Sequence, residues 1–332
     1  MGGRDIVLIG ASAGGVHAIS ELVALFPRDF PAAVFIVLHL SPYGNSAMPQ
    51  ILSRSGPLPA VHPKDGDPIL PGRIYVAPPD HHLLIEPDRI RLSRGPTENG
   101  HRPAVDVLFR TAAQVYRRRV VGVVLTGNLD DGTAGLATIK KEGGVAMVQD
   151  PAEADYPSMP QNAMAVIDVD HVLPIAELVP MLVKVVNEPL ADPDPPPRKE
   201  QTLMNIKKEL ERGEDREGKG EPAGLSCPAC GGTLFERKEG EVIHFRCRTG
   251  HAYSPESLLA EQFESLEATL WAAVRALEEN AALARRMERT MNMRGRAGAT
   301  ASGNRYAQRA NEAERHAALL RQVLLQEQSK QA

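Results

Sequence analysis

An α/β fold built on a doubly wound, mostly parallel β-sheet is the fold class that the sequence predicts for about the first 188 of its 332 residues. Two observations predict it. Short runs of β-branched and other apolar residues recur along this part of the chain, as expected for strands that are buried on both faces of a sheet. Segments with apolar residues every three or four positions lie between these runs, and strands that alternate with helices build parallel sheets.

The expected elements follow one another from the N-terminus. The first strand, Asp5–Ile9, leads into a Gly-rich turn and then into a helix, whose apolar face is expected to carry Val16, Ile19, Leu22 and Leu25. Further strands are expected over 32–40, 73–77, 82–86, 89–93, 120–125 and 145–149, and 82–86 should form a hairpin with 89–93. Helices are expected after the Gly-rich turn that follows residue 125, as far as about 142, and over 157–165 and 175–186.

The composition changes after residue 188. Residues 189–199 (PLADPDPPPRK) are rich in proline and 207–219 is dense in mixed charge, so 189–223 is expected to be a linker with one short helix near 203–210. Beyond 254, two segments with helical spacing flank a stretch rich in Gly and small residues at 294–303, which is expected to break the helix and predicts an antiparallel helical hairpin over 255–332. Apolar stripes on two lone helices suggest self-association or docking of a partner. The stripes consist of Leu259, Phe263, Leu266, Leu270, Val274, Leu277 and Ala281, and of Tyr306, Ala310, Ala313, Ala317, Leu320 and Leu324.

The composition argues against several classes of protein. A formal charge of −4 and a pI near 6.2 argue against binding of nucleic acid through the charge of the whole chain. No apolar run approaches the roughly 18 residues of a membrane-spanning helix, and the chain starts without a basic and apolar leader, so secretion is not expected. The three cysteines cannot all pair in disulfides. These features favour a reducing, cytoplasmic setting.

A Gly-rich turn, GASAGG at 10–15, follows the first strand. It departs from the dinucleotide-binding pattern G-x-G-x-x-G because Ser12 replaces the second glycine, and because the second strand ends in His39-Leu40 rather than in an acidic residue. A serine on such a turn lies at the carboxyl edge of the sheet, beside free N–H groups of the next helix that could stabilise an oxyanion. Two interpretations stay open: Ser12 is a nucleophile, or it only caps the helix.

Two further polar sites follow buried strands. His39 ends the second strand, and the turn at 126–132 (TGNLDDG) carries Asp130 and Asp131. A histidine can take the proton of a serine, and an aspartate can fix the tautomer of that histidine. Because the carboxyl ends of parallel strands share one edge, the three residue types are expected to meet there. The alternatives are a structural histidine and an aspartate, Asp130 above all, that caps the helix beginning near Thr133.

Seven segments carry a family resemblance, in this order: IGASAGG (9–15), FIVLHLSP (35–42), IYVAPPDHHLLI (74–85), RPAVDVLF (102–109), VVLTGNLDDGTAGL (123–136), VAMVQDP (145–151) and MPQNA (159–163). Through them, about the first 188 residues resemble the catalytic domain of the chemotaxis protein-glutamate methylesterases, the CheB family. The resemblance implies hydrolysis of γ-methyl-glutamyl esters of chemoreceptors to glutamate and methanol. Deamidation of glutamine is a second activity that it allows.

The resemblance also implies roles for single residues. It places the nucleophile on Ser12, the base on His39 and the aspartate on Asp131, with the backbone amides of Ala13 and Asn128 holding the oxyanion. Asn128 stands where the family has a methionine, a change that leaves the backbone donor in place. Supporting roles, in packing and hydrogen bonding, are expected for His81, His82, Arg102 and Asp106.

Regulated members of the family begin with a phosphorylatable receiver domain. Ser12 leaves room for a single strand upstream in this sequence. We therefore expect no receiver domain here, and no phosphorylation by that route.

Every cysteine of the chain lies in one short segment. Cys227-x₂-Cys230 and Cys247-x₃-His251 are two ligand pairs separated by 16 residues, a spacing typical of a structural Zn²⁺ ribbon. The segment 224–254 has too small a core to fold alone, and metal binding can supply on the order of 10 kcal/mol. His244 is the alternative fourth ligand, and three unrelated buried cysteines are the alternative to a metal site. Four protein ligands leave no open position, so no catalytic cofactor is expected.

These observations lead to one preferred function and two rivals. The preferred one is a serine esterase that acts on a methylated chemoreceptor or similar signalling protein, with a ribbon and helices that regulate it or bind a partner. The first rival is a signalling or binding protein on the same scaffold that cradles an anion or nucleotide without turnover. The second is a nucleic-acid binder, suggested by the basic ribbon residues Arg237, Lys238, Arg246 and Arg248.

Overall fold

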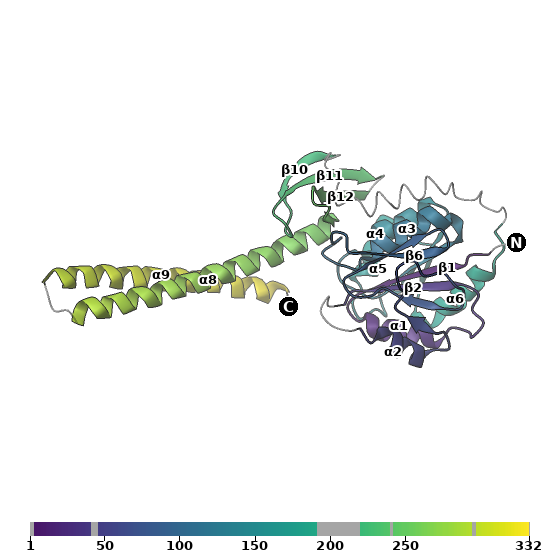
Figure 1. The fold of residues 1–332 in the computed structure, drawn as a ribbon, viewed down its shortest axis with the longest axis horizontal. Coiled ribbons are helices and arrows are strands. Elements are labelled where there is room, and N and C mark those ends of the chain that lie inside the picture. Colours follow the sequence, from purple (N-terminus) through teal and green to yellow (C-terminus); the bar gives the residue numbers. More distant parts are fainter. Residues whose placement is uncertain (1–2, 41–45, 191–219, 240–241, 294–296, 332) are drawn as a thin grey trace. The chain divides into compact units, whose positions relative to one another are not determined.

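The computed structural model describes residues 3–40, 46–190, 220–239, 242–293 and 297–331. They form two compact units, Met1–Leu258 and Leu259–Ala332 (Figure 1). The linker expected over 189–223 and its short helix near 203–210 lie almost wholly outside the described residues, so the domain boundaries expected there stay predictions.

The first unit is built on a seven-stranded sheet in which every neighbouring pair of strands is parallel. Strand β1 (Ile6–Ala11) lies between β2 (Ala33–Leu38) and β7 (Val120–Val124), and every residue of these three strands is buried. This confirms the doubly wound sheet that the apolar runs predicted. The other strands are β3 (Ala60–Val61), β4 (Ile74–Val76), β8 (Val145–Gln149) and β9 (His171–Leu173), in the order β3-β4-β2-β1-β7-β8-β9.

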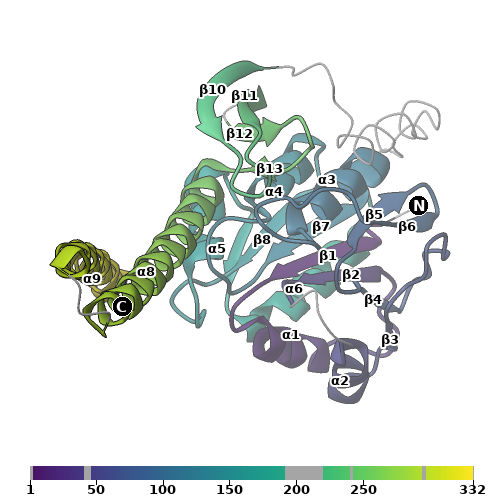
Figure 2. The same cartoon turned by 60° about the vertical axis from the view of Figure 1, so that its left-hand side comes forward.

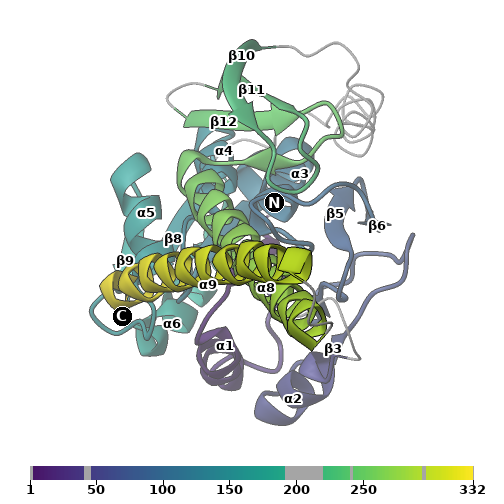
Figure 3. The ribbon, with the colours of Figure 1, turned by 90° about the vertical axis from the view of Figure 1, so that its left-hand side faces the viewer.

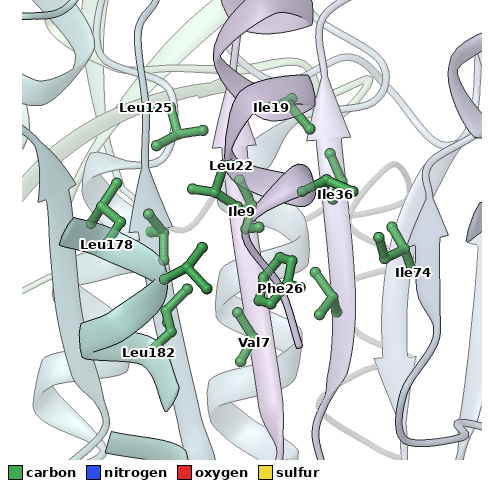
Figure 4. Close-up of a cluster of buried hydrophobic side chains, with 14 of the residues drawn as sticks. Val7, Ile9, Ile19, Leu22, Phe26, Ile36, Ile74, Leu125, Leu178 and Leu182 are labelled. Carbon is green, nitrogen blue, oxygen red and sulfur yellow. The ribbon is translucent and has the colours of Figure 1, made fainter. Parts of the chain in front are cut away.

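Helices cover both faces of the sheet (Figure 2). One face packs against α1 (Gly15–Ala24), α2 (Met48–Ser55) and α6 (Ile175–Asn187). Figure 4 shows this cluster, in which side chains such as Leu22 of α1 and Leu182 of α6 meet strand residues such as Ile9. The other face packs against α3 (Val105–Tyr116), α4 (Thr133–Lys141) and α5 (Ser158–Val166), and a 3₁₀ turn, η1 (Arg117–Arg119), follows α3.

A two-stranded hairpin of β5 (His82–Glu86) and β6 (Arg89–Ser93) stands apart from the main sheet, and the sequence predicted it. Its turn residue Asp88 has φ +62°. The hairpin is tied to α3 by the Ile85 amide, which donates to the Thr111 hydroxyl at 3.2 Å.

The expected apolar face of one helix was wrong, and two helices were not predicted. The buried face of α1 consists of Gly15, Ala18, Ile19, Leu22 and Val23, whereas Val16 and Leu25 are exposed. The face that packs on the sheet is therefore the one that carries the small residues Gly15 and Ala18. Neither α2 nor α3 was predicted from the sequence. The polar residues of α3, Asp106, Arg110 and Gln114, do recur every four positions, but every residue of that helix except Gln114 is buried.

The cysteine-containing segment forms a small antiparallel sheet within the first unit (Figure 3). Its strands are β10 (Glu221–Ser226), β11 (Thr233–Glu239), β12 (Val242–Cys247) and β13 (Ala252–Tyr253). We call this segment, 220–254, the ribbon. Its buried cluster is small, as predicted, and consists of Cys227, Leu234, Cys247 and Tyr253, together with Leu258 of the helix that follows.

The second unit is an antiparallel helix pair. Its helices are α8 (Pro255–Met293), whose first residues belong to the first unit, and α9 (Ala297–Gln331). Arg285 of α8 pairs with Glu314 of α9, and a Cβ at Gly303 would lie 2.5 Å from Asn292 Oδ1. The expected break over 294–303 was too long, because α9 already begins at residue 297. No helix among the described residues is long and apolar enough to cross a lipid bilayer.

The predicted apolar stripe of α8 is covered only in part. Val274 and Ala281 are buried in the helix pair, together with Ala317 and Leu324 of α9. The earlier part of the stripe is exposed, and it consists of Leu259, Phe263 and Leu266.

Candidate active site and metal centre

The ends of the three central strands bring a serine, a histidine and an aspartate together. Ser12 follows β1, His39 follows β2, and Asp131 lies in the turn after β7. Ser12 Oγ lies 3.2 Å from His39 Nδ1, and His39 Nε2 lies 2.8 Å from Asp131 Oδ2. This edge is where ligands bind in open parallel sheets, at the point where the strand order reverses.

The two contacts fix how the His39 ring is used. An ionised carboxylate can only accept hydrogen bonds, so the proton between His39 and Asp131 sits on Nε2. Nδ1 then carries a free lone pair that faces the Ser12 hydroxyl. The His39 side chain is only 7% exposed and that of Asp131 only 3%, so little water competes for these bonds. The arrangement can move a proton from Ser12 to His39.

The turn that carries Ser12 is held rigidly. The Ser12 amide donates to the Thr126 carbonyl at 3.0 Å, and the Thr126 hydroxyl donates to the Ala13 carbonyl at 3.0 Å. Gly14 adopts φ +74°, a conformation that favours glycine, just before α1 begins. A Cβ at Gly127 would lie 2.8 Å from the Ser12 Cβ, so only glycine lets the second turn approach this closely.

The predicted oxyanion donors stand on these same two turns. Ala13 follows Ser12 at the N-terminus of α1, and Asn128 follows Gly127. Within the described part of the chain neither amide donates to another protein group, whereas the Ser12 amide is already bonded to Thr126. The two free N–H groups could therefore donate to a negatively charged oxygen.

Asp131 is held by several donors besides His39. The Val105 amide donates to Oδ2 at 2.7 Å, and the Asp106 amide and the Asn99 side-chain amide donate to Oδ1 at 3.2 and 3.1 Å. Burial alone would raise the pKa of Asp131, but the hydrogen bond and charge of His39 outweigh it and the pKa is lowered. Asp131 is thus kept ionised and in one orientation.

The neighbouring carboxyl of Asp106 has the opposite shift. Burial and then the charge of Asp131 raise the pKa of Asp106 well above its ordinary value. Its oxygens accept hydrogen bonds from the Asn99 side chain and from the amides of Gly132 and Gly135. The supporting role expected for Asp106 agrees with these contacts.

Sequence reasoning missed two residues beside this chain of hydrogen bonds. Asn99 bridges Asp131 and Asp106, and the ring of His101 stacks on the ring of His39 with centroids 3.7 Å apart. Both belong to a tight turn in which Asn99 and Gly100 have φ +52° and +77°. Asn-Gly is the usual pair for a turn with two positive φ angles, so this dipeptide could have predicted the turn from the sequence.

Asp130 does not cap a helix with its side chain. Its backbone carbonyl accepts from the Thr133 amide, and the N-cap of α4 is Gly132, with no side-chain hydrogen bond. The Asp130 carboxylate instead accepts from the hydroxyls of Ser254 and Ser257 at 2.7 and 2.8 Å. The alternative that Asp130 acts as a side-chain cap was wrong.

The ribbon gathers three thiols and an imidazole. One ligand atom each from Cys227, Cys230, Cys247 and His251 lies within 4.8 Å of the others. His251 Nδ1 is 3.6 Å from Cys227 Sγ and 3.5 Å from Cys247 Sγ, and Cys230 Sγ is 3.7 Å from Cys247 Sγ. Thiolates bound tetrahedrally to Zn²⁺ at about 2.3 Å stand about 3.8 Å apart, so the spacing fits this ion.

The fourth position belongs to His251 in this cluster. His244 faces Arg237 across the pairing of β11 and β12 and is not part of the group. The Cys230 thiol is acidic enough to be present as a thiolate, the form that binds metals. Burial would raise its pKa, but hydrogen bonds led by that from the Gly232 amide lower the pKa of Cys230 to about 6. The four residues could hold a metal such as zinc.

A parallel α/β sheet with a hydrogen-bonded serine, histidine and aspartate at its carboxyl edge has the architecture of a serine hydrolase. Comparison with known proteins gives the family. The chain belongs to the CheB methylesterase family, whose model matches residues 7–182, and this confirms the resemblance seen in the sequence.

Three relatives illustrate the match. The chain is 36% identical over 182 residues to a Leptospira interrogans protein, covering 54% of this chain and 94% of that one, whose provisional name is protein-glutamate methylesterase/protein-glutamine glutaminase. It is 36% identical over 191 residues to protein-glutamate methylesterase/protein-glutamine glutaminase 2 of Methanosarcina mazei, covering 55% of this chain and 52% of that one. The crystal structure of the Thermotoga maritima CheB methylesterase catalytic domain matches with 30% identity and a TM-score of 0.53, covering 56% of this chain and 100% of that one.

Proposed function

We propose that this protein is a protein-glutamate methylesterase that hydrolyses γ-methyl-glutamyl esters of chemoreceptors or similar signalling proteins. Membership of the CheB methylesterase family supports the reaction class. The relatives' names also support a second activity, hydrolysis of a glutamine side-chain amide to glutamate. Both reactions transfer the γ-glutamyl acyl group to water, from methoxide in the ester and from ammonia in the amide, so one site can serve both.

The proposed mechanism uses the hydrogen-bonded chain in two steps. Ser12 Oγ attacks the ester carbonyl while His39 Nδ1 takes its proton, and Asp131 stabilises the imidazolium that forms. The amides of Ala13 and Asn128 donate to the oxyanion. His39 then gives the proton to the departing methoxide, and methanol leaves. In the second step His39 takes a proton from water, which attacks the acyl-enzyme, and His39 returns that proton to Ser12 Oγ as glutamate leaves.

One observation carries this proposal. Ser12 Oγ, the His39 ring and the Asp131 carboxylate form a continuous, nearly buried chain of hydrogen bonds with separations of 3.2 and 2.8 Å. A serine that serves only as a helix cap has no need of a histidine whose other nitrogen is bonded to a buried aspartate.

The test is methanol release from a methylated chemoreceptor by the full chain and by its Ser12→Ala variant. We expect the variant to lose on the order of 10⁴-fold or more in kcat with an unchanged circular dichroism spectrum. Ser20→Ala is the matched control, because Ser20 lies in α1 and its hydroxyl only bonds the Val16 carbonyl of its own helix. Wild-type turnover by Ser12→Ala would refute the nucleophile and favour a binding protein without turnover.

We also propose that the ribbon binds a structural Zn²⁺ through Cys227, Cys230, Cys247 and His251. Four protein ligands leave no position for water or substrate, so the ion would hold the ribbon together and take no part in ester hydrolysis. None of the three cysteines forms a disulfide. A reducing compartment such as the cytoplasm, which keeps thiols available for the metal, suits this site.

A further inference from the structure

The turn Thr97–His101 contacts two members of the hydrogen-bonded chain at once. Its Asn99 side chain donates to Asp131 Oδ1, and its His101 ring stacks on His39. Asn99 is 4% exposed, so the bridge is almost completely shielded from water. Any shift of this turn would move the partners of both His39 and Asp131.

The ribbon holds this turn from the other side. The Asn99 amide donates to the Ala252 carbonyl at 2.8 Å, and the Ala252 amide donates to the Thr97 carbonyl at 3.3 Å. The Ser254 amide donates to Asn99 Oδ1 at 2.9 Å. The oxygen of the Asn99 side chain is therefore fixed by the ribbon end, while its nitrogen is fixed by the carboxylates of Asp131 and Asp106.

Two further ties join the ribbon end to the same region. Asp130, next to Asp131, accepts from the hydroxyls of Ser254 and Ser257. Glu98, next to Asn99, forms a buried pair with Arg110 of α3 at 2.7 Å and lies 3.8 Å from Arg246 of β12. These contacts reach the active site only through neighbours of its residues, and none of them touches Ser12.

We propose that the ribbon is a positioning element for the esterase site, with Asn99 as the positioning residue through which it acts. The proposal rests on the proposed function. Ala252 directly follows the ligand His251, so a metal that orders His251 also orders the segment that holds Asn99. Asn99 in turn keeps Asp131 in the orientation that binds His39. Metal occupancy of the ribbon thus controls how well the hydrogen-bonded chain is aligned.

The first test compares Asn99→Gly with wild type in the full chain. Glycine keeps the backbone at φ +52° without strain and removes only the bridging amide. We expect kcat to fall on the order of 10- to 100-fold while KM stays close to the wild-type value, because Asn99 aligns catalytic groups and does not touch substrate. Asp88→Gly is the matched control, since Asp88 has φ +62° in the β5–β6 turn.

A spectroscopic readout separates alignment from a loss of structure. The proton that His39 Nε2 shares with Asp131 gives a downfield resonance in protein with isotope-labelled histidine. We expect this resonance to shift or broaden in Asn99→Gly and to stay unchanged in Asp88→Gly. An unchanged resonance together with an unchanged kcat in Asn99→Gly would overturn the proposal.

The second test removes the metal from the full chain with a chelator and checks metal content. In wild type, kcat should fall and the resonance should change as they do in Asn99→Gly. In Asn99→Gly, chelation should cause little further loss of kcat, because removing the metal and removing the Asn99 side chain break the same chain of contacts from the ribbon to Asp131. Chelated wild type with full kcat and an unaltered resonance would overturn the role of the ribbon. If no form hydrolyses the methyl ester, the proposed function fails, and the resonance, which needs no substrate, still decides the positioning role.

Discussion

The seven-stranded sheet buries a large apolar cluster against each of its faces, whereas the ribbon cluster has five buried residues among those described, two of them cysteines. The sheet can therefore hold its shape by burial of apolar surface, and the ribbon cannot. Ser12 and His39 stand in the part that supports itself. The hydrogen bond from Asn99 to Asp131 lies where the two parts meet, so changes in the ribbon should affect this contact more than any other in the site.

The largest effect should come from removing one of the four proposed metal ligands. We expect Cys247→Ser to lose the metal and the ordered ribbon, because metal binding contributes on the order of 10 kcal/mol to such segments. Metal content and hydrogen exchange over 220–254 measure this, and the sheet should keep its protection.

Two histidine variants sharpen this result. His251→Asn should lose the metal, and His244→Asn, changed in the same way on β12, should retain it. The reverse outcome would make His244 the fourth ligand.

The next effect concerns the sheet and its covering helices. Leu22→Ala should lower the free energy of unfolding by about 4 kcal/mol, because Leu22 is completely buried between α1 and the sheet. Leu25→Ala, at the C-cap of the same helix where the residue is 44% exposed, should cost less than about 1 kcal/mol. Urea unfolding measures both. Metal affinity should not change in either variant, and a large change would contradict the contrast between sheet and ribbon.

A smaller effect is expected at the buried pair of Glu98 and Arg110. Burial would raise the pKa of Glu98, but the charge and hydrogen bonds of Arg110 outweigh it and hold that pKa far below its ordinary value. The pair therefore stabilises the fold above the unfolded glutamate pKa of about 4.3, and this stabilisation is lost as the pH falls toward the folded pKa.

Glu98→Gln should accordingly cost about 3 kcal/mol at neutral pH, and the difference from wild type should shrink below about pH 4. Urea unfolding at several pH values checks this. Glu21→Gln on the exposed face of α1 is the control and should show no such pH dependence. A difference that grows on acidification would contradict the assignment.

The smallest effect lies in the helix pair. Val274→Ala should destabilise the pair by about 2 kcal/mol, because Val274 is buried against Ala317 and Leu324. Leu283→Ala should have almost no effect, since Leu283 is 61% exposed on the same helix. Thermal unfolding should show a lower transition for the pair alone. A concerted shift of the whole chain would mean that the two units unfold together.

Periodicity and strand order were enough to predict much of this molecule. Continuous apolar runs identified β1, β2 and β7, and the polar residues that follow them, Ser12, His39 and Asp131, meet as parallel connectivity requires. Ligand spacing likewise pointed to the cysteine cluster with His251.

The failures have physical causes. Helix α3 was missed although Asp106, Arg110 and Gln114 recur at helical spacing, because these polar residues do not form a solvent-exposed face: Asp106 and Arg110 are buried. The contacts of Asn99 join the turn at 97–101 to Ala252 and Ser254, more than 150 residues later, and no local pattern encodes such a pairing. The Asn99-Gly100 dipeptide predicts a turn, but it does not predict what that turn touches.

The stack of His101 on His39 has a consequence for charge balance in the proposed reaction. Burial, and then the charge of His39, lower the pKa of His101 to about 4, so its ring is neutral at physiological pH. A flat, uncharged ring on one side of the imidazole hinders its rotation without competing for the proton. In the proposed mechanism His39 becomes cationic, and Asp131 is then the neighbour that compensates the new charge.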